Sequence, residues 1–333
     1  MSELTVSVGI PTVNRNEVLF RCLDSLSKQT YSAFEIIIIN AGEYADLKRT
    51  VDKFNNLNIK IFPQLGQGVV EARNLCWIHS KADIVCIIDD DLVLSPDWLK
   101  TIRDTFLSDN NIGGVSGPTI IPEDGQKNRD LTLFIGKFEK SGNMLMRLVG
   151  KIYINVILEN KVREIGKILK SGAFTLGSNF PDCLKLTHPL EVDYLEACHM
   201  CFRRDLLHKL NGFDNVYIGT AEGHEPDLSF RVRKLGYRLL FNPRAVTEHR
   251  ISRGGFLKTR TRAYERSRNF ILFYFKNLKP DTWDKLFRFS VNLAFINGYW
   301  CYKFLESKNP DWLTGLWGSA CELTNNILFG SLN

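Results

Sequence analysis

Residues 84–91 read IVCIIDDD, so that five consecutive apolar residues run directly into three aspartates. An unbroken apolar run of this length is typical of a strand that is buried on both faces of a parallel sheet. Three adjacent carboxylates repel one another unless a cation lies between them. The segment therefore predicts a parallel sheet with a metal site at the carboxyl end of one strand, where open α/β sheets bind their ligands.

Three further apolar runs precede this segment and read as strands, at residues 6–10, 36–39 and 59–62. Apolar residues recur at helical spacing between them. Asn14 followed by Glu17 predicts a capping box at the first helix, and Ser95 followed by Pro96 predicts the start of a helix after the aspartates. The alternation of strands and helices predicts an α/β fold, doubly wound, with a mostly parallel sheet flanked by helices.

The rest of the chain is less regular. Residues 123–192 read as an irregular insertion of the kind that often carries acceptor contacts, whereas a helix is expected to open at Pro226 and to end at Gly236. We predict a catalytic domain over residues 1–255, which includes the insertion, and a basic and aromatic helical appendage over residues 256–333. The aromatic helices suit a membrane interface, and packing on the catalytic domain or on another subunit suits them equally.

Composition limits the class of protein. A chain of 333 residues with 44% hydrophobic content can bury a core without disulfides, so we expect its eight scattered cysteines to be reduced. The first residues lack the pattern of a signal peptide, and no run of 18 apolar residues occurs. We expect a cytoplasmic protein that does not span the membrane; a peripheral position on the cytoplasmic face of the membrane is the alternative.

The net charge of +6 is concentrated in one segment, because residues 248–268 hold seven basic residues and two acids. This excess predicts an anionic partner, which is the phosphate of a nucleotide, the phosphate of a lipid carrier or an anionic membrane surface. A solvated basic helix is the alternative. No zinc finger or RNA-recognition motif is visible in the sequence, so we expect no nucleic-acid partner. The oligomeric state does not follow from the sequence.

The motifs around the aspartates, taken in order, resemble the family 2 glycosyltransferases, which have the GT-A fold. They are VGIPTVNR at 8–15, Gly68 with ARN at 72–74, DDD at 89–91, the segment 193–204 with GFD at 212–214, EPDL at 225–228 with GY at 236–237, and His249. The resemblance implies an inverting enzyme of glycan or polysaccharide biosynthesis. Its donor would be a nucleotide sugar, its acceptor a glycan or a lipid-linked glycan, and its cofactor Mg²⁺ or Mn²⁺.

The resemblance also implies roles for individual residues. Asp89, Asp91 and His249 would bind the metal. Contacts to the nucleotide sugar are implied for Pro11, Thr12, Asn14, Arg15, Asn40, Arg73, Asp89, Asp90, Arg250 and Arg253. Glu225, at the positive end of a helix, would be the general base, with Asp227 and Glu222 as alternatives.

Two positions depart from the family pattern. Asn40 stands where the family usually has an aspartate that reads the base, which leaves the nucleotide open, with uridine as the default. His224 replaces the first acid of the catalytic pair, so that Glu225 carries the role by itself. Cys198 and Cys201 form a C-x-x-C, but we expect them on a buried helix and predict neither a redox nor a zinc site.

Three other functions compete with this interpretation. A transferase that glycosylates a polyprenyl phosphate needs no general base, because its acceptor is already an anion. A nucleotidyltransferase would have a glycine-rich loop after the first strand, and residues 11–14 contain no glycine. A catalytically inactive sugar-binding or scaffold protein would keep the fold without the chemistry.

Overall fold

The computed structural model describes residues 4–121, 141–177, 181–251 and 262–329, and Arg253 therefore lies outside the described residues. The chain divides into two compact units. The first consists of Met1–Pro122, Ser178–Tyr217 and His224–Lys258, and the second of Glu123–Gly177, Ile218–Gly223 and Thr259–Asn333. Residues 123–177 of the insertion thus share a unit with the C-terminal region, residues 178–192 belong to the first unit, and the domain boundary at residue 255 stays a prediction.

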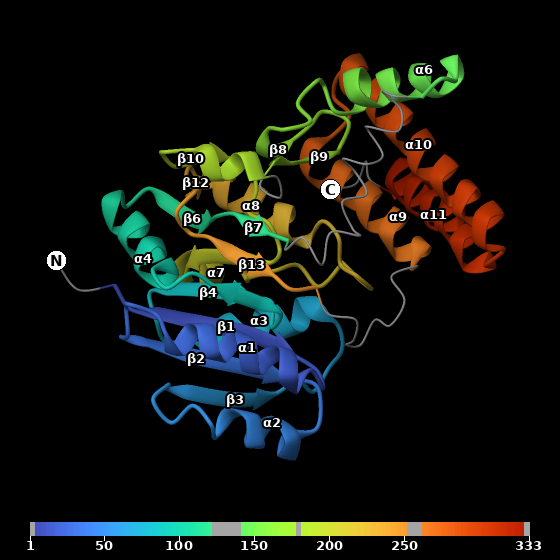
Figure 1. Cartoon of the computed structure of the whole chain (residues 1–333). Coiled ribbons are helices and arrows are strands. Elements are labelled where there is room, and N and C mark those ends of the chain that lie inside the picture. The colour runs from blue at the N-terminus through green and yellow to red at the C-terminus, as the bar shows by residue number, and fades with distance from the viewer. Residues whose placement is uncertain (1–3, 122–140, 178–180, 252–261, 330–333) are drawn as a thin grey trace. The chain divides into compact units, whose positions relative to one another are not determined.

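The first unit is built on an eight-stranded sheet with the order β10-β12-β6-β11-β4-β1-β2-β3 (Figure 1). Its strands are β1 (Val6–Thr12), β2 (Phe34–Asn40), β3 (Ile59–Pro63), β4 (Ile84–Ile88), β6 (Ile112–Ser116), β10 (Leu190–Val192), β11 (His199–Arg203) and β12 (Arg238–Phe241). Strands β3, β2, β1 and β4 are parallel neighbours, as predicted. β11 runs antiparallel between β4 and β6, and β10 is antiparallel to β12. The sheet is therefore mixed but mostly parallel.

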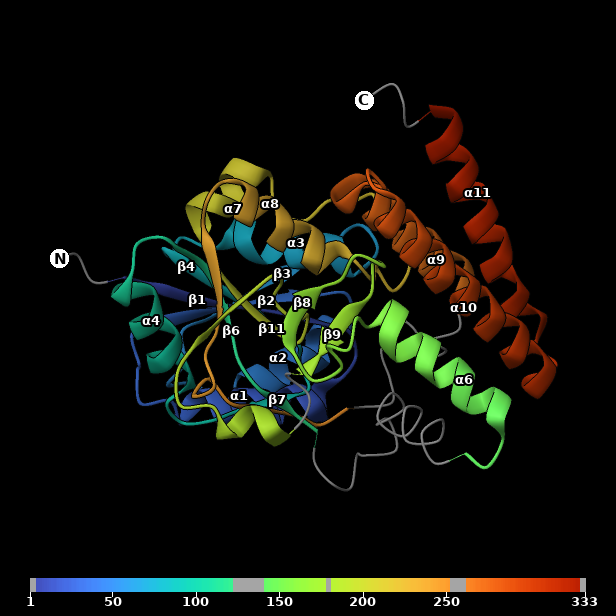
Figure 2. The ribbon, with the colours of Figure 1, turned by 90° about the horizontal axis from the view of Figure 1, so that it is seen from above.

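Helices cover both faces of this sheet. Figure 2 shows α1 (Asn16–Ser27), α2 (Tyr44–Val51) and α4 (Trp98–Ser108) on one face, and α3 (Val69–His79), α7 (Arg204–Leu210) and α8 (His224–Lys234) on the other. A short 3₁₀ helix, η4 (Pro181–Lys185), precedes β10. Helix α3 lies so close to β1 that a Cβ added at Gly9 would lie 2.4 Å from the Cβ of Cys76. Glycine is required at this contact because any side chain would push the helix off the strand.

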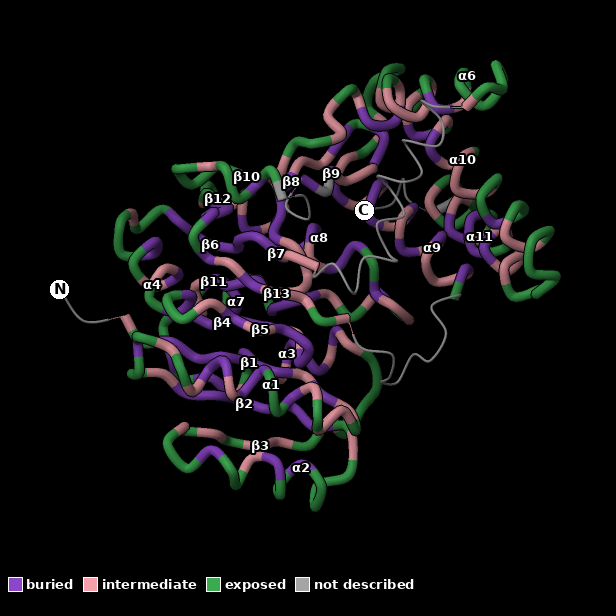
Figure 3. The backbone as a smooth tube through the Cα atoms, viewed as in Figure 1, coloured by how far each residue is buried: buried purple, intermediate pink, exposed green. Residues whose placement is uncertain are grey.

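The main core lies between the sheet and the face covered by α1 and α4. Alternate strand residues point into it, among them Ile10, Ile38 and Ile88, and meet Leu23 and Phe106 from the helices. Nearly every residue of β1, β2 and β4 is buried, as the purple segments in Figure 3 show, whereas the edge strand β3 is only partly buried. Each aliphatic side chain in the core contributes about 1.5–3 kcal/mol when it leaves water. Burial of successive residues explains why β1, β2 and β4 are mostly apolar without alternation.

The two predicted helix caps are wrong. Helix α1 begins after Arg15, which makes no side-chain cap bond, and Asn14 has a left-handed φ of 50°. The Asn14 side chain instead accepts a hydrogen bond of 2.8 Å from the backbone N–H of Glu43. Helix α4 begins at Trp98, and no side-chain cap bond forms there either. Asn14 thus holds two loops together across the sheet rather than starting a helix.

A small second sheet extends the edge beyond β4. It has the order β5-β13-β7, with β5 at Leu92–Leu94, β13 at Thr247–His249 and β7 at Thr119–Ile120. β13 runs antiparallel to β5, with His249 opposite Leu92. This register brings His249 beside the three aspartates that directly precede β5.

The second unit combines a hairpin with helices. It contains α6 (Met144–Ile152), the π-helical turn η2 (Tyr153–Ile157), β8 (Ile165–Ile168), β9 (Phe174–Leu176), α9 (Ala263–Phe273), the π-helical turn η5 (Tyr274–Leu278), α10 (Trp283–Ser307), the 3₁₀ helix η6 (Pro310–Leu313) and α11 (Thr314–Phe329). The insertion binds α10 directly. Arg288 donates to the carbonyl of Val156 at 2.7 Å, and Asn292 donates to that of Ser171 at 3.0 Å. The described part of the C-terminal region is therefore helical, and residues 141–177 of the insertion pack against it.

The described helices include none that combines the length and the apolarity needed to cross a bilayer. The basic residues of the segment 248–268 that the structure describes are paired with acids. The pairs are Arg250 with Glu248, Arg262 with Glu265, Arg266 with Glu222, and Arg268 with Glu322. In the described residues, then, the charge excess predicted for this segment is largely neutralised within the protein.

Candidate active site

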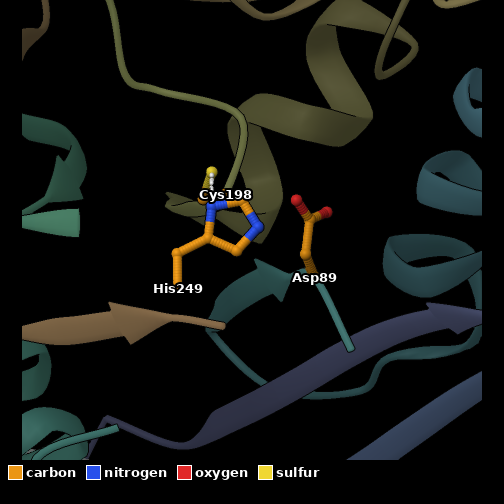
Figure 4. A group of neighbouring side chains, drawn as sticks. All are labelled: Asp89, Cys198 and His249. Atoms are coloured by element: carbon orange, nitrogen blue, oxygen red, sulfur yellow. Dashed lines mark hydrogen bonds between the residues drawn. The ribbon is translucent and has the colours of Figure 1, made fainter. Parts of the chain in front are cut away.

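Three strand ends meet at the aspartates. β4 leads into Asp89, and β11 is antiparallel to it with His199 opposite Ile88, so that Cys198 lies opposite Asp89. The backbone N–H of Asp89 donates to the carbonyl of Cys198 at 2.9 Å. β13 adds His249 through its register with β5. Figure 4 shows the resulting group, in which side chains from three separate strands point toward one another.

Arg15 holds the second and third aspartates. Its two terminal nitrogens lie 2.7 Å from a carboxyl oxygen of Asp90 and 2.6 Å from one of Asp91. Thr12, at the end of β1, donates to the other oxygen of Asp90 at 2.7 Å. The loop after β1 therefore supplies the counter-charge that allows the acidic segment to be buried.

The surroundings shift the pKa values of Asp90 and Asp91 in opposite directions. Burial raises the pKa of Asp90 to about 7, even though Arg15 and Thr12 oppose the shift. Burial acts in the same direction on Asp91, but hydrogen bonds and charge from His249 and Arg15 outweigh it and lower its pKa to about 2. Asp91 is therefore ionised at neutral pH, as a metal ligand must be.

The residues at this edge fit a divalent cation. One ligand atom each from Asp89, Cys198 and His249 lies within 4.8 Å of the others. His249 Nε2 also lies 3.1 Å from Asp91, whose carboxylate completes a set of oxygen, nitrogen and sulfur donors. The structure thus brings the predicted ligands Asp89, Asp91 and His249 together and adds Cys198 to them. Which of them bind the metal stays a prediction.

Arg73 connects the aspartates to the start of α8. One terminal nitrogen lies 3.1 Å from Asp89 and 3.2 Å from the carbonyl of Ala197, and the other lies 3.3 Å from Glu225 and beside His224. Its side chain is only 4% exposed. Through these contacts Arg73 bridges Asp89 and Glu225. Its contact with a phosphate of the donor stays a prediction.

Glu225 lies in the first turn of α8, where the helix dipole favours a carboxylate. Burial disfavours its charged form, but His224 at 3.0 Å and Arg73 outweigh this effect and lower the pKa of Glu225 to about 2. His224, which replaces an acid of the family pattern, therefore acts as a hydrogen-bond partner of Glu225. The carboxylate is therefore ionised at neutral pH, and its side chain is 13% exposed.

The two alternative bases lie in different surroundings. Asp227 is fully buried and accepts hydrogen bonds from Tyr217 at 3.2 Å and from Arg231 at 2.9 Å. These contacts fix α8 to the segment before it and do not favour a role in proton transfer. Glu222 belongs to the second unit, where Arg266 binds it at 2.9 Å. Glu225 is the base that the contacts support best.

The remaining predicted donor residues lie at the carboxyl ends of β1 and β2 and in the loop after β1. Pro11 and Thr12 pair with Ile39 and Asn40 in the parallel register. The Asn40 amide closes a tight turn, because it donates to the carbonyl of Gly42 at 2.9 Å and accepts from its N–H at 3.0 Å. A Cβ added at Gly42 would lie 2.1 Å from Oδ1 of Asn14. Asn14 and Asn40 are therefore neighbours across this turn.

Arg250 follows β13 directly. Its backbone N–H donates to the carbonyl of Asp91 at 3.0 Å, while its side chain pairs with Glu248 at 2.7 Å. It lies beside the acidic segment, but its predicted contact with a phosphate stays a prediction. Arg253, predicted for the same role, lies outside the described residues.

Sequence reasoning missed two residues of this site. Cys198 and Cys201 lie at the start of strand β11 and within it, so the helix expected there is wrong. Glu196 was not singled out at all; its Oε1 is buried and has no hydrogen-bond partner among the described residues. Burial and the nearby charge of Glu225 raise the pKa of Glu196 to about 8. Only the register of β11 could have revealed either residue, because no motif marks them.

Solved structures share this fold at low sequence identity. The Pyrobaculum calidifontis mannosyltransferase PcManGT, in complex with GDP-Man and Mn²⁺, matches with a TM-score of 0.54 at 15% identity, over 97% of this chain and 86% of its own. S. aureus TarS 1–349 in complex with UDP-GlcNAc matches with a TM-score of 0.59 at 16% identity, over 94% and 80%. The fold is that of the GT-A glycosyltransferases, as the sequence predicted.

Sequence comparison adds the family. Residues 7–158 match the sequence model of Glycosyl transferase family 2. The glucosyl-dolichyl phosphate glucuronosyltransferase of Haloferax volcanii is 27% identical over 75% of this chain and 69% of its own. The chondroitin synthase of Escherichia coli is 31% identical over 32% of this chain and 16% of its own length. Residues 7–158 therefore carry the sequence pattern of a family 2 glycosyltransferase domain, and the curated relatives that the chain matches are glycosyltransferases.

Proposed function

We propose that this protein is an inverting, metal-dependent glycosyltransferase that moves a sugar from a nucleotide sugar to a hydroxyl of a glycan or lipid-linked glycan. The observation that carries the proposal is the bridge formed by Arg73, which links Asp89 to Glu225. It joins a cation-binding edge to an ionised carboxylate within one site. Donor activation and acceptor deprotonation would thereby occur side by side.

For the donor we propose a UDP-sugar, bound along the loops after β1 and β2. The carboxamide of Asn40 is already occupied by Gly42, so base recognition would fall to the backbone of this turn and to Asn14. A screen of product release with UDP-, GDP- and dTDP-sugars tests the choice. Faster turnover with a GDP- or dTDP-sugar would overturn the uridine assignment.

In the proposed reaction the acceptor hydroxyl attacks the anomeric carbon from the face opposite the leaving group, which inverts the configuration. The bond from that carbon to the diphosphate oxygen breaks, and the hydroxyl proton passes to Glu225. A bound Mg²⁺ or Mn²⁺ would neutralise the departing diphosphate. Asp89, Asp91 and His249 would hold the ion, while Arg15 keeps Asp91 in place.

The test is Glu225→Gln, which keeps the shape of the side chain and removes the base. We expect kcat to fall by about 10²–10⁴-fold, while the donor KM changes little. Glu17→Gln, on the exposed surface of α1, is the matched control and should leave both constants unchanged. Undiminished turnover of Glu225→Gln would sink the assignment of the base.

The second candidate function is transfer to a polyprenyl phosphate. The name of the Haloferax volcanii relative shares the polyprenyl lipid carrier with this candidate, but its acceptor is the sugar already on the dolichyl phosphate, as in the first candidate. Such a phosphate acceptor needs no general base, so Glu225→Gln would keep its activity with a short polyprenyl phosphate. Activity of the wild-type protein with a hydroxyl acceptor, lost in this variant, would instead support the first candidate.

We also propose that the second unit contacts an anionic membrane surface on the cytoplasmic side. Helix α6 exposes Met144 (80%), Leu145 and Leu148 beside Arg147 and Lys151, and contains no acidic residue. This combination suits the interface of a bilayer with anionic lipids. Green segments mark the exposed residues of α6 in Figure 3.

Vesicle sedimentation tests this contact. Wild-type protein should sediment with phosphatidylserine vesicles at low salt and remain in the supernatant with neutral ones. The double variant Leu145→Ser with Leu148→Ser should lose binding, whereas Leu107→Ser on exposed α4 should retain it. If the wild-type protein binds neither kind of vesicle, the membrane surface is excluded as a partner.

A further inference from the structure

The thiol of Cys198 lies inside the cation-binding edge rather than in the core. Its Sγ is 3.5 Å from Nδ1 of His249, and both belong to the group that includes a carboxyl oxygen of Asp89 (Figure 4). The side chain is half-buried, so a small ion is able to reach it. The other member of the C-x-x-C, Cys201, is fully buried in the main core, opposite Cys86. The two thiols therefore do not form one site.

The pairing of β11 with β4 places Cys198 beside Asp89. Cys201 lies within β11, whereas Cys198 lies in the turn directly before His199, where the strand begins. One thiol consequently enters the core, and the other remains at the strand end beside Asp89. A backbone hydrogen bond of 2.9 Å from Asp89 to Cys198 fixes the two residues against each other.

We propose that Cys198 supplies a sulfur ligand to the divalent ion of this site, together with Asp89 and His249. The proposal rests on the metal dependence proposed above. Two ligand atoms on one ion, each about 2.0–2.3 Å from it, lie at most about 4.6 Å apart. The three donor atoms lie within 4.8 Å of one another, so only a slight movement would bring them onto one ion.

A sulfur ligand changes which metals the site prefers. Thiolate and imidazole suit zinc and its neighbours, whereas Mg²⁺ requires oxygen ligands and keeps its waters. The site should therefore bind Co²⁺, Zn²⁺ and Cd²⁺ more tightly than Mg²⁺, with Mn²⁺ between them. An all-oxygen site built only from the aspartates would lack this preference.

The same contact permits a second role, in which Cys198 only orients the ring of His249. Spectroscopy separates the two roles, because sulfur bound to Co²⁺ or Cd²⁺ produces a charge-transfer band in the near ultraviolet, and sulfur in an outer position does not. Loss of an outer partner costs about 10–100-fold in metal affinity, and loss of a direct ligand should cost at least as much. The band is therefore the deciding readout.

The experiment titrates the full chain, freed of metal by a chelator, with Co²⁺ and then with Cd²⁺. We expect a charge-transfer band that saturates at one equivalent and disappears in Cys198→Ser. Cd²⁺ binding of this variant should weaken about 100-fold, while Mg²⁺ binding changes little. Cys301→Ser, at an exposed position of α10, is the control and should keep the band.

A titration without a charge-transfer band, or a band that persists unchanged in Cys198→Ser, would overturn the proposal. Should the variant fail to fold, alkylation of the wild-type protein answers the same question. Bound Cd²⁺ should then protect Cys198 from the reagent, as read by peptide mass spectrometry, and leave Cys301 reactive. Equal labelling of Cys198 with and without Cd²⁺ would contradict it. A protein with the band but without transferase activity would contradict the proposed function alone.

Discussion

Two pairs of carboxyl groups lie near Arg73, one in the acidic segment after β4 and one near the start of α8. In each pair the surroundings shift the two pKa values in opposite directions. In the acidic segment after β4, the pKa of Asp90 is raised to about 7 and that of Asp91 is lowered to about 2. Near the start of α8, the pKa of Glu196 is raised to about 8 and that of Glu225 is lowered to about 2.

Hydrogen-bond partners explain the difference, because all four groups are desolvated. Asp91 and Glu225 each combine an arginine with a histidine, His249 in one case and His224 in the other. Asp90 has no histidine partner, and Glu196 has an unsatisfied oxygen among the described contacts. Burial therefore raises the pKa of a carboxyl that lacks a histidine partner, whereas a paired arginine and histidine keep a buried carboxyl charged. The two ionised members are the ones to which we assign roles in metal binding and proton transfer.

The largest effect is expected when the charged member of the first pair is removed. Asp91→Ala should abolish the heat stabilisation that UDP with Mn²⁺ gives the wild-type protein, and should lower kcat/KM by about 10²–10³-fold. Thermal unfolding with and without ligand measures the first effect. Asp104→Ala, on the exposed side of α4, is the control. A full ligand response in Asp91→Ala would remove Asp91 from the site, and the absence of any response in the wild-type protein would support a scaffold.

The next test removes Arg73, which connects Asp89 of the acidic segment to Glu225 of α8. Arg73→Met leaves Asp89 and Glu225 without their shared partner and should lower the free energy of unfolding by an amount at the lower end of about 3–5 kcal/mol, since Asp89 is partly exposed. Urea denaturation measures this loss, with Arg49→Met on exposed α2 as the control. A stability equal to that of the control would show that the bridge contributes little.

A smaller effect concerns the pH dependence of Glu225. Because its pKa is lowered in the folded state, Glu225 adds stability above pH 4.5, and this contribution disappears as the pH falls toward 2. The stability advantage of the wild-type protein over Glu225→Gln should therefore shrink between pH 6 and pH 3. Thermal unfolding across this range measures it. A constant difference would mean that the folded state does not lower the pKa.

A pH effect with the opposite sign is expected at Glu196. Its pKa is raised in the folded state, so its ionisation costs stability increasingly as the pH rises from 4.5 through 8. Glu196→Gln should match the wild-type protein near pH 5 and exceed it in melting temperature near pH 9. The two glutamates would then show opposite pH trends, and parallel trends would refute the division described above.

The parallel half of the fold could be predicted because its signals are local. The runs in β1 to β4 are mostly apolar, and each strand was expected within two residues of its observed ends. The caps were not predictable in the same way, because Asn14 bonds to Glu43 on another loop. A residue that can cap a helix can equally join two loops, and only the neighbouring strand decides between them.

The candidate site likewise has one part that local sequence signals predicted and one part that only the tertiary structure revealed. By itself the sequence determined the α/β class, the acidic segment after β4, and the candidates His249 and Glu225, because these follow from short motifs with a fixed chemistry. The tertiary structure decided that β11 is antiparallel between β4 and β6, and so that Cys198 lies beside Asp89 and Glu196 near Glu225. Strand register joins residues more than a hundred positions apart, and its energy comes from backbone hydrogen bonds and burial that no local pattern records.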